Sequence, residues 1–189
     1  SLNGATESMT DKSGKQLLLN FPSHPEYSFS NFVVSDGSRI AFETAKEFCS
    51  GSRQVAFQAL YIFGQNNLGK THLLLSIGNL TAKNGSRAVF IEGSDFAHKM
   101  KDIESLEARN TLDQLLDVDF FLMDNVEGIA HSSTAQEKLY HIYNQITEKG
   151  GKLAFTASLP PDKNSAMESY LTSRFQWGMV AEIKPIDDA

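Results

Sequence analysis

The sequence is poor in several residue types, and each shortage excludes a class of protein. Its 189 residues contain a single cysteine, Cys49, so no internal disulfide can form, as is typical of a reducing cytoplasm. No apolar run approaches the roughly 20 residues of a membrane-spanning helix, and no signal peptide is visible. The net charge of −6 disfavours a broad, nonspecific grip on DNA phosphates. We therefore expect a cytoplasmic protein that does not bind membranes and binds DNA weakly or not at all.

The remaining composition is that of an ordinary globular domain. With 41% hydrophobic and 21% charged residues, the chain can bury one sizeable core. Residues 1–8 are interpreted as an expression remnant, because Met9 would serve as a natural start. Residues 9–26 then form an N-terminal segment, and residues 27–189 form the nucleotide-binding domain argued for below.

The stretch from Gly64 to Thr71 fits G-x-x-x-x-G-K-[ST], the phosphate-binding loop, at every fixed position. An apolar run at 59–63 precedes it and a helical pattern follows it, which is the required context. Glycines let successive backbone N–H groups point at phosphate oxygens, and the helix N-terminus adds partial positive charge. Lys70 would reach the β- and γ-phosphates of a nucleoside triphosphate, and the Thr71 hydroxyl would bind Mg²⁺. The candidate nucleotide-binding residues of the loop are Gly64, Gln65, Asn66, Asn67, Leu68, Gly69, Lys70 and Thr71.

Strand patterns and helical patterns alternate along the rest of the chain. Strands separated by helices predict a parallel sheet covered on both faces, the α/β class. The predicted strands are 58–63, 88–91, 119–124, 153–157 and 179–183, and the predicted helices end at Gly51, run from Thr71 to Asn84, lie twice within 94–116, and occupy 133–149 and 165–173.

The strand predicted at 119–124 is apolar and ends in Asp124. Such an aspartate is usually a turn former or helix cap, but downstream of a phosphate loop it predicts a Mg²⁺-binding carboxylate. Many ATPases of this kind place an acid next, to polarise the attacking water, whereas this chain has Asn125. An amide cannot accept a proton near neutral pH, so we expect binding to outperform hydrolysis. Glu127 is an alternative proton acceptor, and a plain surface role for it stays open.

Arg174 lies between the helix predicted at 165–173 and the last predicted strand. An arginine at such a place can point out of its own subunit and reach the γ-phosphate held by a neighbour. Taken alone, the local sequence favours an ordinary surface or salt-bridged arginine.

Together, these segments resemble the DnaA/Hda branch of the AAA+ ATPases over about residues 16–187. Tyr27–Val34 is similar to a family box that lies against adenine, and Leu68–Leu73 matches the family's phosphate loop, including His72. Asp124–Glu127 is closer to the pattern of Hda members than to that of DnaA. Ser173–Gly178 resembles the family's arginine-finger box. The resemblance implies an AAA+ base domain with a five-stranded parallel sheet in the order 5-1-4-3-2. It also implies bound ADP or ATP with Mg²⁺. The residues to which it gives roles are Asn31, Phe32, Val33 and His72 around the nucleotide, Asp124 and Asn125 in catalysis, and Arg174 as a finger supplied in trans.

Gln16–Phe21 resembles the Q-L-x-L-x-[LF] peptide by which bacterial proteins dock on the sliding clamp of DNA polymerase III. The Gln16 amide would bind in a small polar pocket, and Leu17, Leu19 and Phe21 would fill an apolar groove. The alternative is a short edge strand or a hydrophobic flap over the domain's own core.

The chain also departs from the family pattern. We expect a base domain without the helical lid and without the C-terminal helix-turn-helix domain of DnaA. The run from Asp113 to Asp117 is acidic where DnaA has basic residues. Ala157–Pro161 lacks the charges usual after this strand, so a sensor role does not carry over to Ser158.

Two functions of different classes follow. The first is a regulatory adaptor, at most a weak ATPase. This adaptor would bind nucleotide, dock on the clamp, and work as a monomer or a homo-oligomer. It would offer Arg174 to ATP held by DnaA and so restrain replication initiation. The second is a DnaA-like initiator or helicase loader that acts on DNA through its own ATP turnover. A degenerate paralogue used only for protein interactions is a third option.

Overall fold

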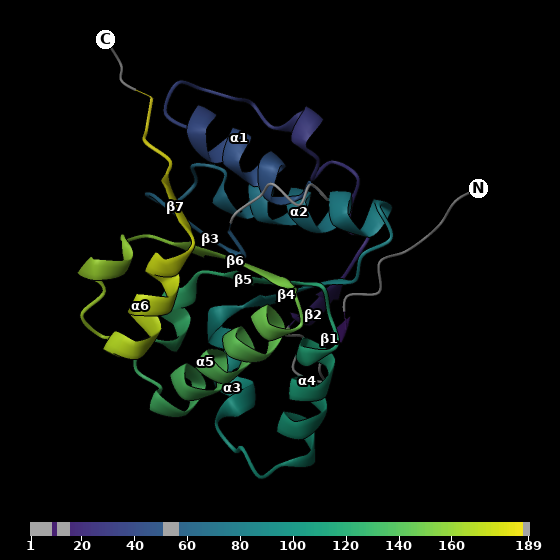
Figure 1. Cartoon of the computed structure of the whole chain (residues 1–189), viewed down its shortest axis with the longest axis vertical. Helices are drawn as coiled ribbons and strands as arrows, with labels where there is room; N and C mark the ends of the chain where they lie inside the picture. The colour runs from purple at the N-terminus through teal and green to yellow at the C-terminus, as the bar shows by residue number, and fades with distance from the viewer. Residues whose placement is uncertain (1–8, 11–15, 51–56, 187–189) are drawn as a thin grey trace.

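The computed structural model describes residues 9–10, 16–50 and 57–186, and its centre is a sheet between two layers of helices (Figure 1). The strands are β1 (Met9–Thr10), β2 (Gln16–Asn20), β3 (Ala59–Phe63), β4 (Ala88–Glu92), β5 (Phe120–Asp124), β6 (Lys152–Ala157) and β7 (Met179–Glu182). The helices are α1 (Arg39–Phe48), α2 (Lys70–Lys83), α3 (Gly93–Met100), α4 (Leu106–Leu116), α5 (Ser133–Glu148) and α6 (Ser169–Trp177), with short 3-10 helices η1 (Phe29–Asn31), η2 (Val126–Ile129) and η3 (Pro161–Lys163). Across these described ranges, none of the helices has the length and apolar character needed to cross a membrane.

Five parallel strands lie in the order β4-β5-β6-β3-β7. Counted along the chain within this parallel set, the order is 2-3-4-1-5, which is 5-1-4-3-2 seen from the other side. The predicted sheet is therefore confirmed. Helices connect the parallel strands, as parallel pairing requires.

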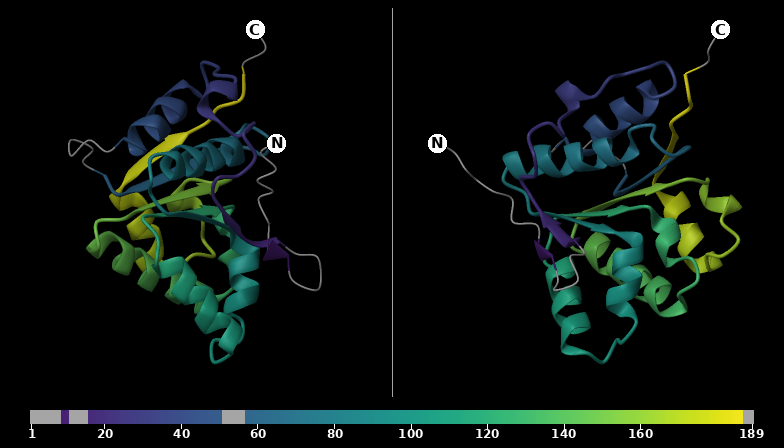
Figure 2. Two further views of the ribbon diagram at one scale, coloured as in Figure 1. Left: turned by 90° about the vertical axis from the view of Figure 1, so that its right-hand side faces the viewer. Right: turned by 180° about the vertical axis from the view of Figure 1, so that it is seen from behind.

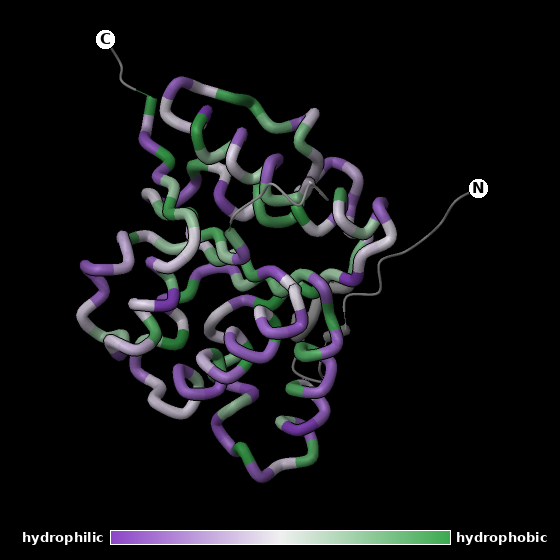
Figure 3. Tube along the Cα trace, viewed as in Figure 1, coloured by the Kyte–Doolittle hydropathy of each residue, from purple (hydrophilic) through white to green (hydrophobic). Residues whose placement is uncertain are grey.

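The central strands are buried on both faces, and alternate side chains feed two cores. In β3, Leu60 and Ile62 pack with α1 and α2, whereas Tyr61 packs with α6 through Phe175. Figure 2 shows the same arrangement from two directions, with α1 and α2 on one face and α3 to α6 on the other. Hydrophobic and hydrophilic residues alternate along these helices, as expected for helices that cover a sheet on one side only (Figure 3).

Beyond the parallel set, β2 pairs antiparallel with β4, with Leu19 opposite Phe90 and Asn20 opposite Val89, and β1 pairs with β2. The backbone of the clamp-like peptide is thus an added strand of the domain's own sheet, as the edge-strand alternative has it. The side chains of Gln16, Leu17 and Leu19 lie outside the described part of the structure.

Helix α2 holds the chain segment that follows β2. The ring of Phe21 lies over Gly78, where an added Cβ would meet ring atoms at 2.1–2.5 Å. At the next residue of α2, the Asn79 side-chain amide accepts from the Ser23 backbone N–H at 2.5 Å and donates to the Tyr27 carbonyl at 2.8 Å. The segment from Phe21 to Tyr27 therefore depends on a glycine and an asparagine of the helix that starts at the phosphate loop.

The last helix begins four residues later than predicted, because its start is set by a distant contact. The Glu168 backbone N–H donates to the Gln136 side chain of α5 at 2.7 Å, and α6 starts at the next residue. It runs to Trp177 and ends at Gly178, where an added Cβ would lie 2.0 Å from the Ala59 carbonyl. Arg174, expected after this helix, lies within its last turn instead.

Candidate nucleotide site

A cavity of about 550 Å³ lies at the carboxyl ends of the parallel strands, the usual place for ligand sites in such sheets. We call it the carboxyl-edge cavity. It is lined by Asn66, Asn67, Gly69, Lys70, Thr71, His72, Asp124, Asn125, Thr156 and Ser158.

The phosphate loop has the backbone shape its glycines predict. Asn67 and Gly69 have φ values of 64° and 93°, a region in which L side chains are strained. Gly64 cannot carry a side chain, since an added Cβ would lie 2.5 Å from the Ile183 carbonyl oxygen. Helix α2 begins at Lys70, and its first N–H groups have no partner within the helix. The loop can therefore cradle an anion at a helix N-terminus.

Lys70 is folded back on the loop. Its ammonium donates to the carbonyl oxygens of Gly64 and Gln65, the latter at 2.7 Å. Burial lowers the pKa of Lys70 from its usual value, and the carboxylates of Glu127 and Asp124 oppose that shift. The ammonium is thus held at the cavity by weak neutral acceptors, which a phosphate oxygen can replace with a stronger charge-assisted bond.

A chain of hydrogen bonds joins the phosphate loop to the ends of β5 and β6. The Thr71 hydroxyl donates to one oxygen of Asp124 at 2.9 Å, and the Thr156 hydroxyl donates to the other at 2.6 Å. Thr156 also accepts from the Asn125 backbone N–H at 2.8 Å. The two residues predicted to hold Mg²⁺ are thus in direct contact. Sequence reasoning missed Thr156, although it is the one hydroxyl in an otherwise apolar strand end.

Asn125 lies at the tip of this arrangement. It lines the cavity in a left-handed conformation, with φ 57° and ψ 68°, which asparagine tolerates better than most residues. Its side chain offers an amide, not a carboxylate, to the cavity.

Of the other residues predicted around the nucleotide, His72 lines the cavity, whereas Asn31, Phe32 and Val33 lie outside its lining. Phe32 packs over Gly69, with a ring atom 2.7 Å from the position of an added Cβ. His72 hydrogen-bonds the Ser28 carbonyl at 2.9 Å and meets the Phe32 ring edge-on at 5.4 Å. Val33 is 88% exposed, and the Asn31 amide donates to the Glu26 carbonyl at 3.3 Å. Of the other loop residues, Leu68 packs against the α1–α2 core, so it supports the loop from beneath.

Arg174 does not line the cavity of its own chain. Its guanidinium donates to the Asn144 side chain and the Tyr140 hydroxyl, both at 3.1 Å, and lies 3.6 Å from the Trp177 ring centre. These partners are neutral, and Trp177 is 69% exposed. Arg174 is therefore half-buried between α5 and α6, in contacts that do not neutralise its charge.

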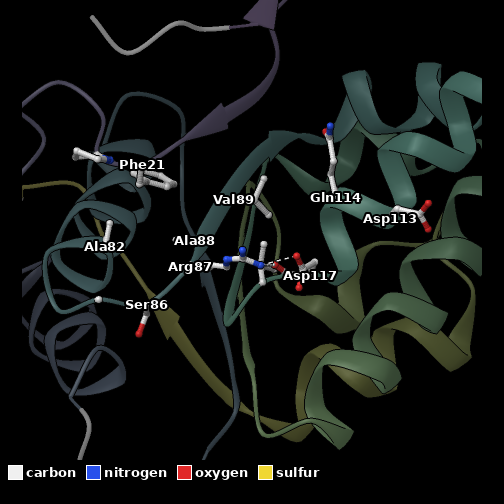
Figure 4. A pocket seen from close by; sticks show the side chains of 12 residues that line it. Phe21, Ala82, Ser86, Arg87, Ala88, Val89, Asp113, Gln114 and Asp117 are labelled. Atoms are coloured by element: carbon white, nitrogen blue, oxygen red, sulfur yellow. Dashed lines mark hydrogen bonds and ion pairs between the residues drawn. The ribbon is translucent and has the colours of Figure 1, made fainter. Parts of the chain in front are cut away.

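A second cavity, of about 600 Å³, lies at the amino ends of β4 and β5. We call it the amino-edge cavity. Figure 4 shows Phe21 and Ala82 on one side of it, Gln114 and Asp113 on the other, and an ion pair between Arg87 and Asp117 in the middle.

Comparison with known proteins identifies the family. Residues 23–182 match the family model of the bacterial DnaA ATPase domain. The chain belongs to this family. Two curated relatives named chromosomal replication initiator protein DnaA are 32% identical over 178 residues, in Wolinella succinogenes, and 33% identical over 180 residues, in Thermotoga maritima. Each alignment covers 92% of this chain.

Solved structures agree with this assignment. Domain III of Thermotoga maritima DnaA superposes with a TM-score of 0.78 at 33% identity, covering 88% of this chain and 70% of that one. AMPPCP-bound DnaA from Aquifex aeolicus gives 0.79 at 28% identity, covering 85% and 50%. The DnaC helicase loader shares the fold, with a TM-score of 0.71 at 16% identity. The chain spans about 40% of the length of the curated DnaA relatives.

Proposed function

We propose that this chain is the nucleotide-binding module of a DnaA-like initiator or helicase loader, which binds ATP or ADP with Mg²⁺ in the carboxyl-edge cavity. The single observation that carries the proposal is the contact between Thr71 of the phosphate loop and Asp124 of β5, with Lys70 at the same cavity. Support comes from the family, whose curated relatives are named replication initiators, and from the Aquifex relative that holds AMPPCP.

The residues present suit Mg²⁺. Mg²⁺ is usually held by one or two protein oxygens together with phosphates and waters, and Thr71 and Asp124 supply an alcohol and a carboxylate one hydrogen bond apart. When bound, the ion would neutralise charge on the β- and γ-phosphates. Thr156 would keep the Asp124 carboxylate aimed at this place.

Turnover by such a module is expected to be slow, because Asn125 stands where a proton acceptor would be needed. Calorimetry with ADP and ATP, with and without Mg²⁺, tests binding, and a steady-state phosphate-release assay tests turnover. We expect binding of both nucleotides and a turnover below the usual enzyme range of about 1–10³ per second. The Asn125→Asp variant should raise turnover while leaving affinity unchanged. Absence of nucleotide binding would refute the proposal.

A second function is favoured by the half-buried Arg174, whose hydrogen-bond partners are neutral, and by Asn125. In the Hda-like variant, the chain docks on the sliding clamp through Gln16–Phe21 and offers Arg174 to ATP bound by DnaA, as a monomer or homodimer. Because the hydrogen-bond partners of Arg174, Asn144 and Tyr140, are neutral, they do not cancel its charge, and the guanidinium can exchange them for a phosphate held by a neighbouring subunit. Arg174→Lys should then abolish stimulation of DnaA-bound ATP hydrolysis in a clamp-loaded DNA assay. Equal stimulation by the wild type and by Arg174→Lys would exclude the Hda-like function.

Clamp docking would also require β2 to separate from β4, because the two strands are paired through their backbones. Hydrogen exchange of the β2 and β4 amides, measured with and without the clamp, tests this separation.

A further inference from the structure

The β2–β4 ladder stops at the amino-edge cavity. Its last pair is Asn20 with Val89, and the chain then turns to α2, where the Phe21 ring lies over Gly78. Ala88, which precedes Val89 in β4, therefore lies beyond the ladder, and it lines the cavity. An extended segment can continue along β4 from this point, in the manner of β-strand addition.

The two walls of the amino-edge cavity come from helices on opposite faces of the sheet, and they differ in chemistry. The end of α2 and the segment after β2 supply the apolar residues Phe21, Pro22 and Ala82. The end of α4, on the other face, supplies Asp113 and Asp117 (Figure 4). Successive side chains of a strand point to opposite faces of its sheet. A segment added along β4 would thus place alternate side chains against an apolar wall and an acidic wall.

The acidic wall carries a negative charge that the chain itself leaves uncompensated. Asp117 pairs with Arg87, whereas Asp113 belongs to no ion pair within the described part of the chain. Both aspartates lie at the C-terminal end of α4, where the helix dipole is already negative, and the last turn of α4 holds no basic residue. Lys149 of α5 reaches this end of α4, but it donates to the Leu116 carbonyl. A cation beside Asp113 would therefore relieve an unfavourable arrangement of charge.

We propose that the amino-edge cavity is a docking site for an extended segment of a partner protein in which basic and large apolar residues alternate. A small cation would contact the acidic wall but leave the apolar wall unused, and a wholly apolar segment would do the reverse. A second copy of this chain, with a net charge of −6, suits an acidic wall less well than a basic partner does. Docking does not require bound nucleotide, because the phosphate loop lies at the opposite edge of the sheet.

The probe is a fluorescein-labelled hexapeptide of alternating arginine and leucine with blocked termini, titrated with the protein and followed by fluorescence anisotropy. We expect saturable one-to-one binding that weakens as salt is added, because exposed charges are screened. A peptide with serine in place of leucine should bind about tenfold more weakly or worse, since it buries less apolar surface. A peptide with glutamate in place of arginine should not bind, because like charges would face one another.

Variants of the two walls locate the binding. Asp113→Asn combined with Asp117→Asn should weaken binding of the arginine–leucine peptide about tenfold, through the loss of two exposed ion pairs. Ala82→Trp fills the apolar side of the cavity and should weaken binding at least as much. The matched control is Glu43→Gln with Glu47→Gln, which removes the same charge from the exposed face of α1 and should change the affinity less than about twofold. Melting curves check that each variant is folded.

The possible contrary results point to different occupants. Absence of saturable binding by the arginine–leucine peptide overturns the proposal, and so does an equal loss in the α1 control, because overall charge alone would then explain the affinity. Spermine that displaces the peptide at equal concentration would show that the cavity takes a small cation instead of a protein segment. Dimers in sedimentation of the wild type that are lost in the Asp113→Asn, Asp117→Asn variant would make a second copy the occupant. ADP affinity should stay within about twofold of wild type in every variant, and a parallel loss would show that the changes act through the fold.

Discussion

The carboxyl-edge and amino-edge cavities are similar in size, about 550 and 600 Å³, but they differ in whether their cation is paired with a carboxylate. At the amino edge, charges satisfy one another: the Arg87 guanidinium pairs with Asp117, and the Arg87 backbone N–H donates to Asp119 at 2.8 Å. At the carboxyl edge, the Lys70 ammonium donates to backbone carbonyls, beside the first turn of α2, whose N–H groups have no partner within the helix. A negatively charged ligand can therefore form new favourable contacts only in the carboxyl-edge cavity.

The difference teaches that volume alone does not locate a functional site. The two cavities lie at opposite edges of the same parallel sheet, and each is lined by one lysine or arginine, Lys70 or Arg87. What separates them is the end of α2 that each one adjoins: Asn67 and Gly69, with positive φ, lead into the first turn of α2 at the carboxyl edge, whereas Gly85, also with positive φ, follows the last turn of α2 at the amino edge.

The largest expected effect tests the two cations against each other. Lys70→Ala removes the ammonium from the phosphate cradle and should weaken ADP and ATP binding by about 100-fold, the loss of one or two charge-assisted hydrogen bonds. Arg87→Ala removes an exposed ion pair at the other edge and should leave nucleotide affinity unchanged. Calorimetry on both variants checks this. Equal losses would show that the two cavities do not differ as described.

The next effect compares two glycines with the same backbone. Gly69 and Gly85 have φ values of 93° and 89°, so Gly→Ala strains both by about 1–2 kcal/mol. At Gly69 the new methyl also meets Phe32 at 2.7 Å, whereas at Gly85 there is open space. Gly69→Ala should therefore lower nucleotide affinity at least tenfold, and Gly85→Ala should lower only the melting temperature. Matching affinities in the two variants would argue against a cradle at Gly69.

A smaller effect is expected from two buried threonines. Thr156→Val removes the hydroxyl between Asp124 and the Asn125 N–H, leaving a part-buried donor unpaired at a cost of about 1 kcal/mol. We expect nucleotide affinity about tenfold weaker and less dependent on Mg²⁺. Thr81→Val removes only donation to carbonyls of its own helix and should have little effect on binding. Mg²⁺ titrations at fixed ADP concentration distinguish Thr156→Val from Thr81→Val. An unchanged Mg²⁺ dependence in Thr156→Val would contradict a role for Thr156 in aiming the Asp124 carboxylate.

The parts that the sequence predicts well are those whose causes are local. The phosphate loop, the apolar strands and Asp124 are each set by neighbours in the chain, and the sheet order follows from the family that these motifs identify. The Thr71–Asp124 contact was expected because both residues end up at the carboxyl edge of adjacent parallel elements.

The parts that were missed depend on partners far away in the chain. Thr156 became a site residue because β6 lies next to β5, and Ser158 entered the cavity because Glu127 and Tyr61 hold its loop. The start of α6 was misplaced because the Gln136 side chain, not a local signal, binds the Glu168 N–H. The sequence pattern around each of these residues carries no trace of its partner.

The smallest expected effect on nucleotide binding comes from the middle of α2, which lies between the two cavities. Gly78→Ala places a methyl where the Phe21 ring lies, so the ring must leave, while the helix gains about 1 kcal/mol of intrinsic propensity. Phe21 borders the amino-edge cavity, so that cavity should change and the β2–β4 ladder should exchange its amide hydrogens faster. ADP affinity should stay within about threefold of wild type, because no phosphate-loop atom moves.

The matched control for this variant removes the ring instead of displacing it. Phe21→Ala should give the same faster exchange at the β2–β4 ladder, and adding Gly78→Ala to it should change nothing further, because the two changes act on one contact. If Gly78→Ala alone weakens ADP binding as much as Gly69→Ala does, the segment from Phe21 to Phe32 supports the phosphate loop through α2. The two cavities would then be coupled through that helix, and the separation drawn between them would be wrong.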